Sequence, residues 1–191
     1  MKKVLSLIFV LFVCTSFIFA DEPGDEYDDG YFYETNGAGD QFLKIGIMPY
    51  IPLNFDNKLI IGGAGELGYY RFLNRCLAIG GEVNFSFNIT LANNVLTTLP
   101  ILFGVTAQYT VGKFEFPVMI GIGMAYETAQ NSNYFPGFAM KLDVGGFFRA
   151  TEAWSFGLTC KAWWLPQWFA DPKYNDDGFF LAPALSLRYH F

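Results

Sequence analysis

The sequence has no long apolar run after its first 20 residues, and it carries few charges. A membrane-spanning helix needs about 20 consecutive apolar residues, and beyond residue 20 glycine or polar residues interrupt every apolar stretch. Charged residues make up 16% of the 191 residues, whereas soluble domains carry roughly 25%. Spanning helices are therefore excluded after residue 20, although 52% of the chain is hydrophobic.

Basic residues, histidine and cysteine are also scarce. The 12 lysines and arginines are scattered, which excludes an extended nucleic-acid surface. His190 is the only histidine and stands beside the last residue, so no histidine-dependent enzyme is expected at the opposite end of the domain. Cys76 and Cys160 fall on elements that we expect to lie too far apart for a disulfide. No cofactor or metal site is indicated.

The N-terminal 40 residues differ from the rest of the chain. Residues 1–20 have a basic start followed by an apolar core that ends at Ala20, which predicts a signal peptide. Residues 21–40 are acidic and aperiodic, which predicts a flexible periplasmic leader. The folded domain is expected to occupy residues 41–191.

After Gln41 the chain alternates with a period of two. Between Leu77 and Leu91 every odd position is apolar or glycine, and every even position is small or polar. This pattern is typical of a strand with one apolar face. Eight such strands are predicted, at about residues 41–53, 58–71, 77–91, 95–111, 114–126, 138–149, 154–165 and 179–191.

The number and length of the strands favour a closed barrel. Membrane barrels of single bacterial chains have an even number of strands, and each strand needs roughly 9–11 residues to cross. The connections near Asn74, Lys113 and Thr151 are short, which suits periplasmic turns, whereas residues 128–137 and 166–178 suggest longer outer loops. The predicted fold class is all-β, an eight-stranded antiparallel up-and-down transmembrane β-barrel.

The chemistry of the two strand faces decides which one points inward. A soluble barrel would expose its polar face and cover it with long charged side chains, but here that face is mostly Gly, Ala, Ser, Thr and Asn. Small side chains suit the narrow interior of an eight-stranded barrel. The other face is bulky and nearly free of charge, and a Lys or Arg there would cost about 2–4 kcal/mol at the bilayer midplane. The apolar face should therefore contact outer-membrane lipid, around a monomer.

The last strand carries a resemblance to a known class of proteins. Four large apolar residues alternate with small or polar ones up to the end of the chain: Leu185, Leu187, Tyr189 and Phe191. This resembles the closing strand of bacterial outer-membrane β-barrels, whose terminal aromatic is read by the barrel assembly machinery. The whole segment after Gln41 resembles the small barrels of the OmpA-transmembrane, OmpX and OmpW type. The resemblance implies an outer-membrane location and an assembly signal in these four residues, but no activity.

Charged residues on the small-residue face define a candidate site inside the barrel. They are Lys44, Glu66, Glu82, Lys141, Asp143, Lys161 and Arg188. Unpaired charges away from water are costly, so these side chains should pair. We expect Asp143 to lie beside Lys161, and Arg188 to serve as the counter-charge of Glu66 and Glu82. Such a network is either a salt-bridge plug or an ion path, and the narrow lumen favours the plug.

Toward the predicted outer mouth the inward positions become large and apolar. They are Met48, Tyr50, Leu96, Trp163 and Phe180. These residues form either a shallow vestibule for a small hydrophobic solute, as the resemblance to OmpW-type barrels implies, or a packed upper plug. The last outer loop offers Trp168, Phe169 and Tyr174 as exposed contact residues. The predicted function is non-enzymatic, either structural or passive passage of small solutes; a surface-exposed adhesin or ligand-binding protein is the alternative.

Overall fold

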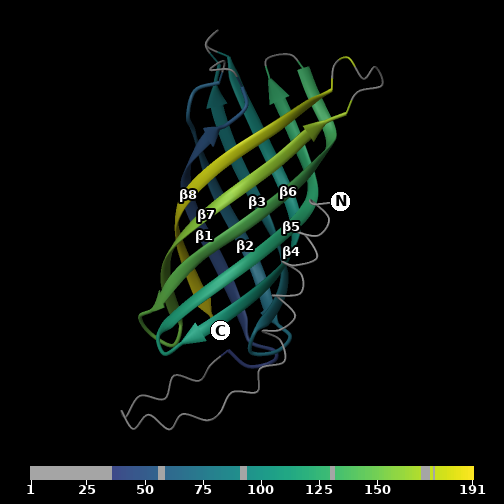
Figure 1. Ribbon diagram of the computed structural model, residues 1–191. Helices are drawn as coiled ribbons and strands as arrows, with labels where there is room; N and C mark the ends of the chain where they lie inside the picture. Colours follow the sequence, from purple (N-terminus) through teal and green to yellow (C-terminus); the bar gives the residue numbers. More distant parts are fainter. Residues whose placement is uncertain (1–35, 56–58, 91–93, 130–131, 169–172, 174) are drawn as a thin grey trace, which may run out of the picture. The chain divides into compact units, whose positions relative to one another are not determined.

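The computed structural model describes residues 36–55, 59–90, 94–129, 132–168, 173 and 175–191. These residues form eight antiparallel strands closed into a barrel, in which each strand pairs with its neighbours in sequence and the last pairs with the first (Figure 1). The strands are β1 (Gln41–Pro52), β2 (Gly62–Phe72), β3 (Leu77–Ile89), β4 (Val95–Val111), β5 (Phe114–Ala129), β6 (Ser132–Arg149), β7 (Trp154–Gln167) and β8 (Asp176–His190). The predicted fold class is confirmed. The expected signal peptide and residues 21–35 lie outside the described residues.

One predicted outer loop is wrong. Residues 128–137 are largely strand, because β5 continues to Ala129 and β6 begins at Ser132. A register shift between Ala125 and Glu127 lets the two strands pair beyond the point where their alternation weakens. Pro136 and Gly137 interrupt the apolar pattern there, which hid the start of β6 in the sequence. Within the described ranges, no helix is long and apolar enough to cross a membrane.

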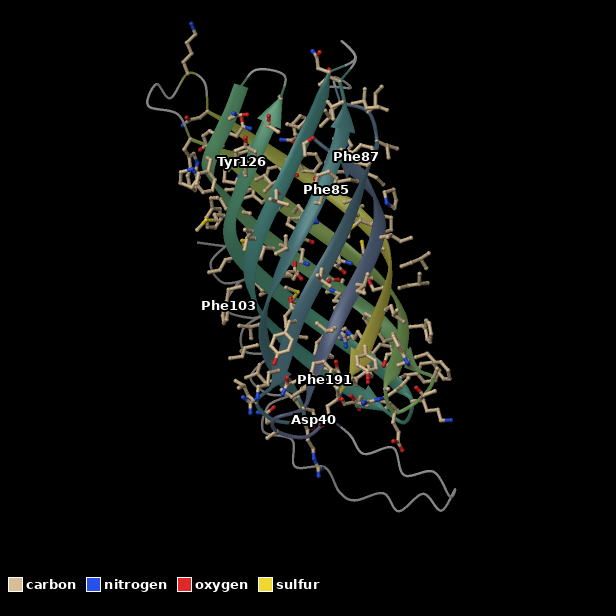
Figure 2. All side chains as sticks on the ribbon, turned by 180° about the vertical axis from the view of Figure 1, so that it is seen from behind. Asp40, Phe85, Phe87, Phe103, Tyr126 and Phe191 are labelled. Atoms are coloured by element: carbon tan, nitrogen blue, oxygen red, sulfur yellow. The ribbon has the colours of Figure 1, made fainter. Side chains whose placement is uncertain are left out.

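The outer wall is apolar over its whole height. Outward side chains such as Phe103 and Leu158 are 55% and 67% exposed. Figure 2 shows Phe85, Phe87 and Phe103 along the wall, with Phe87 level with Tyr126 near one end and Phe191 near the other. Exposure of so many large apolar side chains is unfavourable in water and matches a bilayer interior. The prediction that the apolar face points outward is confirmed.

The two ends of the barrel differ in their connections. We call the end that carries residues 73–76, 112–113 and 150–153 the turn end, and the opposite end the loop end. Gly112 has a φ of 55°, a left-handed conformation that favours glycine in the tight β4–β5 hairpin. That hairpin is the one predicted at Gly112 and Lys113.

Residues 36–40 belong to the base of the barrel at the turn end. The Gly39 amide donates to the Phe72 carbonyl at 2.9 Å, and the Phe72 amide donates to the Asp40 carbonyl at 2.8 Å. Asn36 is 2% exposed, and its Oδ1 accepts a hydrogen bond from Arg149 Nη1 at 2.8 Å. The segment that the sequence predicts as a flexible leader therefore has an ordered end.

The seam between β1 and β8 is interrupted near the loop end. Its ladder pairs residues 42–47 with residues 185–190, and then resumes where Ile51 pairs with Leu181. The interval holds Pro49 and Pro183, which have no backbone N–H to donate. The closing seam is therefore locally weaker than the ladder between β4 and β5, which is continuous from Leu96 to Val111.

Candidate functional site

Six buried charges meet in the middle of the lumen, and we call them the central cluster. They come from five strands and comprise Lys44, Glu66, Glu82, Lys141, Asp143 and Lys161. Three are acidic and three are basic, so their formal charges cancel. Their side chains are 4% exposed or less. A balanced cluster of this kind avoids the large cost of an isolated buried charge.

Glu66 is the hub of the central cluster. Lys161 Nζ lies 3.0 Å from its Oε1, and Lys44 Nζ lies 3.3 Å from the same atom. Lys141 Nζ lies 3.3 Å from Oε2. One carboxylate thus contacts all three lysines, while Asp143 pairs closely with Lys44 and lies 3.7 Å from Lys161. The expected proximity of Asp143 and Lys161 is what the structure shows.

Neutral side chains complete the hydrogen bonding of the central cluster. Glu82 forms an ion pair with Lys141 and accepts hydrogen bonds from Tyr70 Oη at 2.8 Å and Asn84 Nδ2 at 2.9 Å. An inward glycine makes room for Tyr70, because a Cβ at Gly104 would lie 3.1 Å from its Oη. Small residues on this face therefore accommodate the larger polar ones.

Arg188 does not have the partners that the sequence suggested, and this prediction is wrong. Its Nη1 donates to Gln108 Oε1 at 2.7 Å and lies 3.4 Å from Glu115 Oε2. The guanidinium also lies between two aromatic rings, 4.7 Å from the Phe42 centroid and 3.8 Å from the Phe147 centroid. Glu66 and Glu82 are instead neutralised by lysines. Alternation indicates the face of a residue but not the height at which tilted strands bring residues together across a lumen.

Arg188 belongs to a second group near the turn end, which we call the basal cluster. It consists of Arg188, Glu115 and Arg149, whose Nη1 lies 3.3 Å from Glu115 Oε1. Glu115 is fully buried, and the alternation of its strand already points it inward. Arg149 is not among the predicted lumen charges because it is the last residue of its strand, next to the turn.

Little space remains between the two clusters. A cavity of about 10 Å³ lies there, bounded by Tyr70, Thr106, Asp143 and Arg188 among others. That volume holds about one water molecule. A hydrated ion does not fit through it without displacement of the buried charges.

A serine and the only histidine lie together at the turn end. Ser155 Oγ is 2.9 Å from His190 Nε2, which is the separation of a nucleophile and its base. However, Ser155 is fully buried and His190 Nδ1 has no hydrogen-bond partner among the described residues. The pair therefore lacks both substrate access and the third group that would orient the imidazole.

An apolar group occupies much of the loop-end half of the lumen. Met48, Tyr50, Trp163 and Phe180 are each 5% exposed or less, and Leu96 packs against them. The rings of Tyr50 and Phe180 are stacked with centroids 4.3 Å apart. These five residues thus pack together as a plug rather than lining an open vestibule.

The remaining predicted contact residues lie on the outer surface or outside the described residues. Trp168 is 55% exposed and stacks on Phe138 at 5.7 Å. Phe169 and Tyr174 lie outside the described residues. The four residues of the expected assembly signal form the outward face of the last strand, where Leu185 is 61% and Phe191 56% exposed.

Comparison with solved structures reveals the same architecture. Neisserial surface protein A matches with a TM-score of 0.61 and 8% identity, over 80% of this chain and 99% of that one. Ail, the attachment invasion locus protein of Yersinia pestis, matches with a TM-score of 0.52 and 13% identity over 80% and 99%. The outer membrane protein OprG from Pseudomonas aeruginosa matches with a TM-score of 0.50 and 10% identity over 82% and 97%. At these identities the likeness shows a shared fold.

Two uncharacterised proteins of Treponema pallidum (strain Nichols) are similar in sequence. One is 29% identical over 143 residues, which cover 65% of this chain and 65% of that protein. The other is 26% identical over 195 residues, which cover 83% of this chain and 66% of that protein. The chain thus spans just under two thirds of the length of each relative.

The barrel fold and the apolar outer wall both indicate a location in the outer membrane. An eight-stranded barrel with an apolar exterior is the fold of small outer-membrane proteins, and the expected outer-membrane location is confirmed. One protein-family model matches residues 23–189, which is most of the chain. The chain therefore belongs to the family that this model defines, and it is a small outer-membrane β-barrel.

Proposed function

We propose that this protein is a non-enzymatic structural barrel whose lumen is closed to ions and solutes. The observation that supports this role is the central cluster, in which six charges are paired at 4% exposure or less. Below it, the basal cluster and its aromatic neighbours leave a cavity of only about 10 Å³. Above it, the apolar plug around Tyr50 and Phe180 fills part of the lumen toward the loop end.

Passage of small solutes would require the central cluster to open. An open path needs a continuous column of water. The ion pairs of the central cluster connect charges from different strands, so such a column could form only if these pairs separated. Separating one ion pair in this lumen leaves a buried charge without compensation, which costs several kcal/mol. A closed state is therefore the stable state of the barrel.

A planar-bilayer recording tests the closed lumen. Wild-type protein is expected to produce no conductance steps, even at high protein load. Lys161→Ala leaves the central cluster with an excess acid and a void, and it should admit water and small cations. Arg75→Ala, at an exposed turn, serves as the matched control. Discrete steps from the wild-type protein that Lys161→Ala alters and Arg75→Ala does not would replace this proposal with a channel.

Surface binding at the loop end is a second candidate. Trp164 and Trp168 lie at the rim with ring centroids 6.4 Å apart, and Trp164 stacks on Phe179. Exposed tryptophans are frequent in binding surfaces, although an interface belt uses the same residues. The name of Ail refers to attachment and invasion, and this chain shares its fold.

Binding of whole folded protein to a panel of extracellular-matrix proteins tests this candidate. Trp168→Ala should reduce binding severalfold, whereas Trp154→Ala at the turn end should leave it unchanged. If the two variants bind like the wild type, the aromatic rim is a membrane belt and the surface role is rejected.

A further inference from the structure

Glu127 is a buried carboxylate with no ion-pair partner among the described residues. It lies on the inward face of β5 near the loop end and is 4% exposed. Its Oε2 accepts a hydrogen bond from Gln167 Nε2 at 2.5 Å. Its Oε1 is buried and has no hydrogen-bond partner within the described part of the chain. By contrast, Glu66 and Glu115 each contact at least one cation.

A small cavity lies beside Glu127. Its volume is about 40 Å³, which exceeds the space of a single water. Polar, aliphatic and aromatic side chains share its wall, among them Thr98, Glu127, Leu165, Gln167, Phe55 and Phe180. The two phenylalanine rings pack with centroids 5.0 Å apart. The carboxylate of Glu127 and the aromatic pair thus line the same cavity.

The chemistry of this wall suits an organic cation better than a metal ion. Calcium takes six to eight oxygen ligands, whereas the cavity offers one free carboxylate oxygen, the Gln167 amide and the Thr98 hydroxyl, which is already bonded to Ser86. An ammonium group needs fewer partners, because it donates to a carboxylate and is attracted by aromatic faces. The cavity has room for a compact head group such as methylammonium.

We propose that this cavity binds the primary ammonium group of a small amine. The ammonium donates to Glu127 Oε1, and the adjoining carbon contacts Phe55 and Phe180. Because the central cluster closes the lumen below, the amine enters and leaves at the loop end. The site therefore holds a ligand and does not transport it, which makes it independent of whether the barrel is structural or surface-binding.

Titration of the folded full-length chain with methylammonium chloride tests the site. In detergent micelles, the amide resonances of Leu96, Glu127 and Gln167 should shift and saturate. Glu127→Gln keeps the shape of the side chain but removes its charge, and it should weaken binding about tenfold or more. Phe55→Ala should also weaken binding, whereas Glu152→Gln, an exposed carboxylate at the turn end, should not.

Three results would overturn the proposal. They are no saturation below about 0.1 M methylammonium, equal shifts with sodium chloride at the same ionic strength, or equal affinity of Glu127→Gln once its barrel is shown to be folded. A further arm identifies the source of the amine. Competition by vesicles that contain phosphatidylethanolamine supports a lipid head group, and its absence together with saturable binding supports a free amine.

Discussion

The two halves of the lumen are both buried, but they satisfy their polar groups in different ways. In the half nearer the turn end, every buried charge among the described residues has an ion-pair partner. Asn84 and His190 each have one polar atom without a hydrogen-bond partner there, but their other side-chain polar atom is hydrogen-bonded. In the loop-end half, Tyr50 Oη and Trp163 Nε1 have no hydrogen-bond partner among the described residues. The turn-end half thus combines ion pairs with an aromatic cluster around Phe42, whereas the loop-end half combines apolar packing with neutral hydrogen bonds such as that between Ser86 and Thr98.

The proposed closed lumen and the proposed amine site thus lie in different halves. Paired charges fill the middle of the lumen, where each fixes the position of its neighbours and removal of any one leaves a partner uncompensated. Apolar packing tolerates small changes and leaves a cavity with an unpaired carboxylate at Glu127. We therefore expect substitutions in the paired half to affect stability most, and substitutions in the packed half to affect ligand binding most.

The largest expected effect is that of Glu66→Gln. The substitution removes the carboxylate that contacts three buried lysines and leaves the central cluster with one excess positive charge. We expect a loss of about 3–5 kcal/mol in the free energy of unfolding. Urea unfolding in lipid vesicles, followed by tryptophan emission, measures it. Glu152→Gln at the exposed turn should change the value by less than about 0.5 kcal/mol, and a comparable loss in both variants would contradict the hub role.

A single hydroxyl group gives a finer measure of the paired half. Tyr70→Phe removes the hydrogen bond from Tyr70 Oη to Glu82 Oε2, which measures 2.8 Å. Hydrogen bonds to charged groups contribute about 1.5–3 kcal/mol, so a loss in that range is expected in the same unfolding assay. A change of less than about 0.5 kcal/mol would mean that water replaces the hydroxyl, and the cluster would then be wetter than its burial indicates.

The corresponding substitution in the packed half should be nearly silent. Tyr50→Phe keeps the ring that stacks on Phe180 at 4.3 Å and removes a hydroxyl that has no partner among the described residues. We expect a change within about 0.5 kcal/mol, in either direction. A loss as large as that of Tyr70→Phe would show that both halves depend equally on hydrogen bonding, and the contrast between them would be lost.

Much of the architecture could be predicted from the sequence, because a membrane wall imposes a strict rule on each residue. Every outward position must be apolar, so a period of two persists through strands such as β3 and β5, and it reveals both strands and faces. The requirement for apolar outward residues applies only to the part of a strand that lies within the bilayer. For that reason the start of β6 at Ser132, before Pro136 and Gly137, was mistaken for a loop.

The sequence predicts which charged residues lie in the lumen better than it predicts which of them form ion pairs. All seven predicted charges lie inside the barrel, yet Arg188 pairs with Glu115 on β5, a strand far from β8 around the wall. Contacts across a lumen depend on strand tilt and register, which alternation does not encode. Glu127 was missed for another reason. The predicted strand ends at Tyr126, so Glu127 falls just beyond it, and its lack of a cation depends on which side chains surround it in the folded barrel.

The smallest expected effect concerns hydrogen exchange at the closing seam, near the packed half. Pro49 and Pro183 interrupt the ladder between β1 and β8, whereas the ladder between β4 and β5 is continuous from Leu96 to Val111. Amides without a stable ladder partner open locally at lower free energy. Ile51 and Leu181 pair across the seam beside the interruption, whereas Phe103 pairs with Ile122 of β5 inside the continuous ladder. In vesicles, the amides of Ile51 and Leu181 should therefore exchange about tenfold faster than that of Phe103, without any change in global stability. Equal protection at the three sites would show that the seam is closed as firmly as the rest of the wall, so that the loop-end half would differ from the turn-end half only inside its lumen.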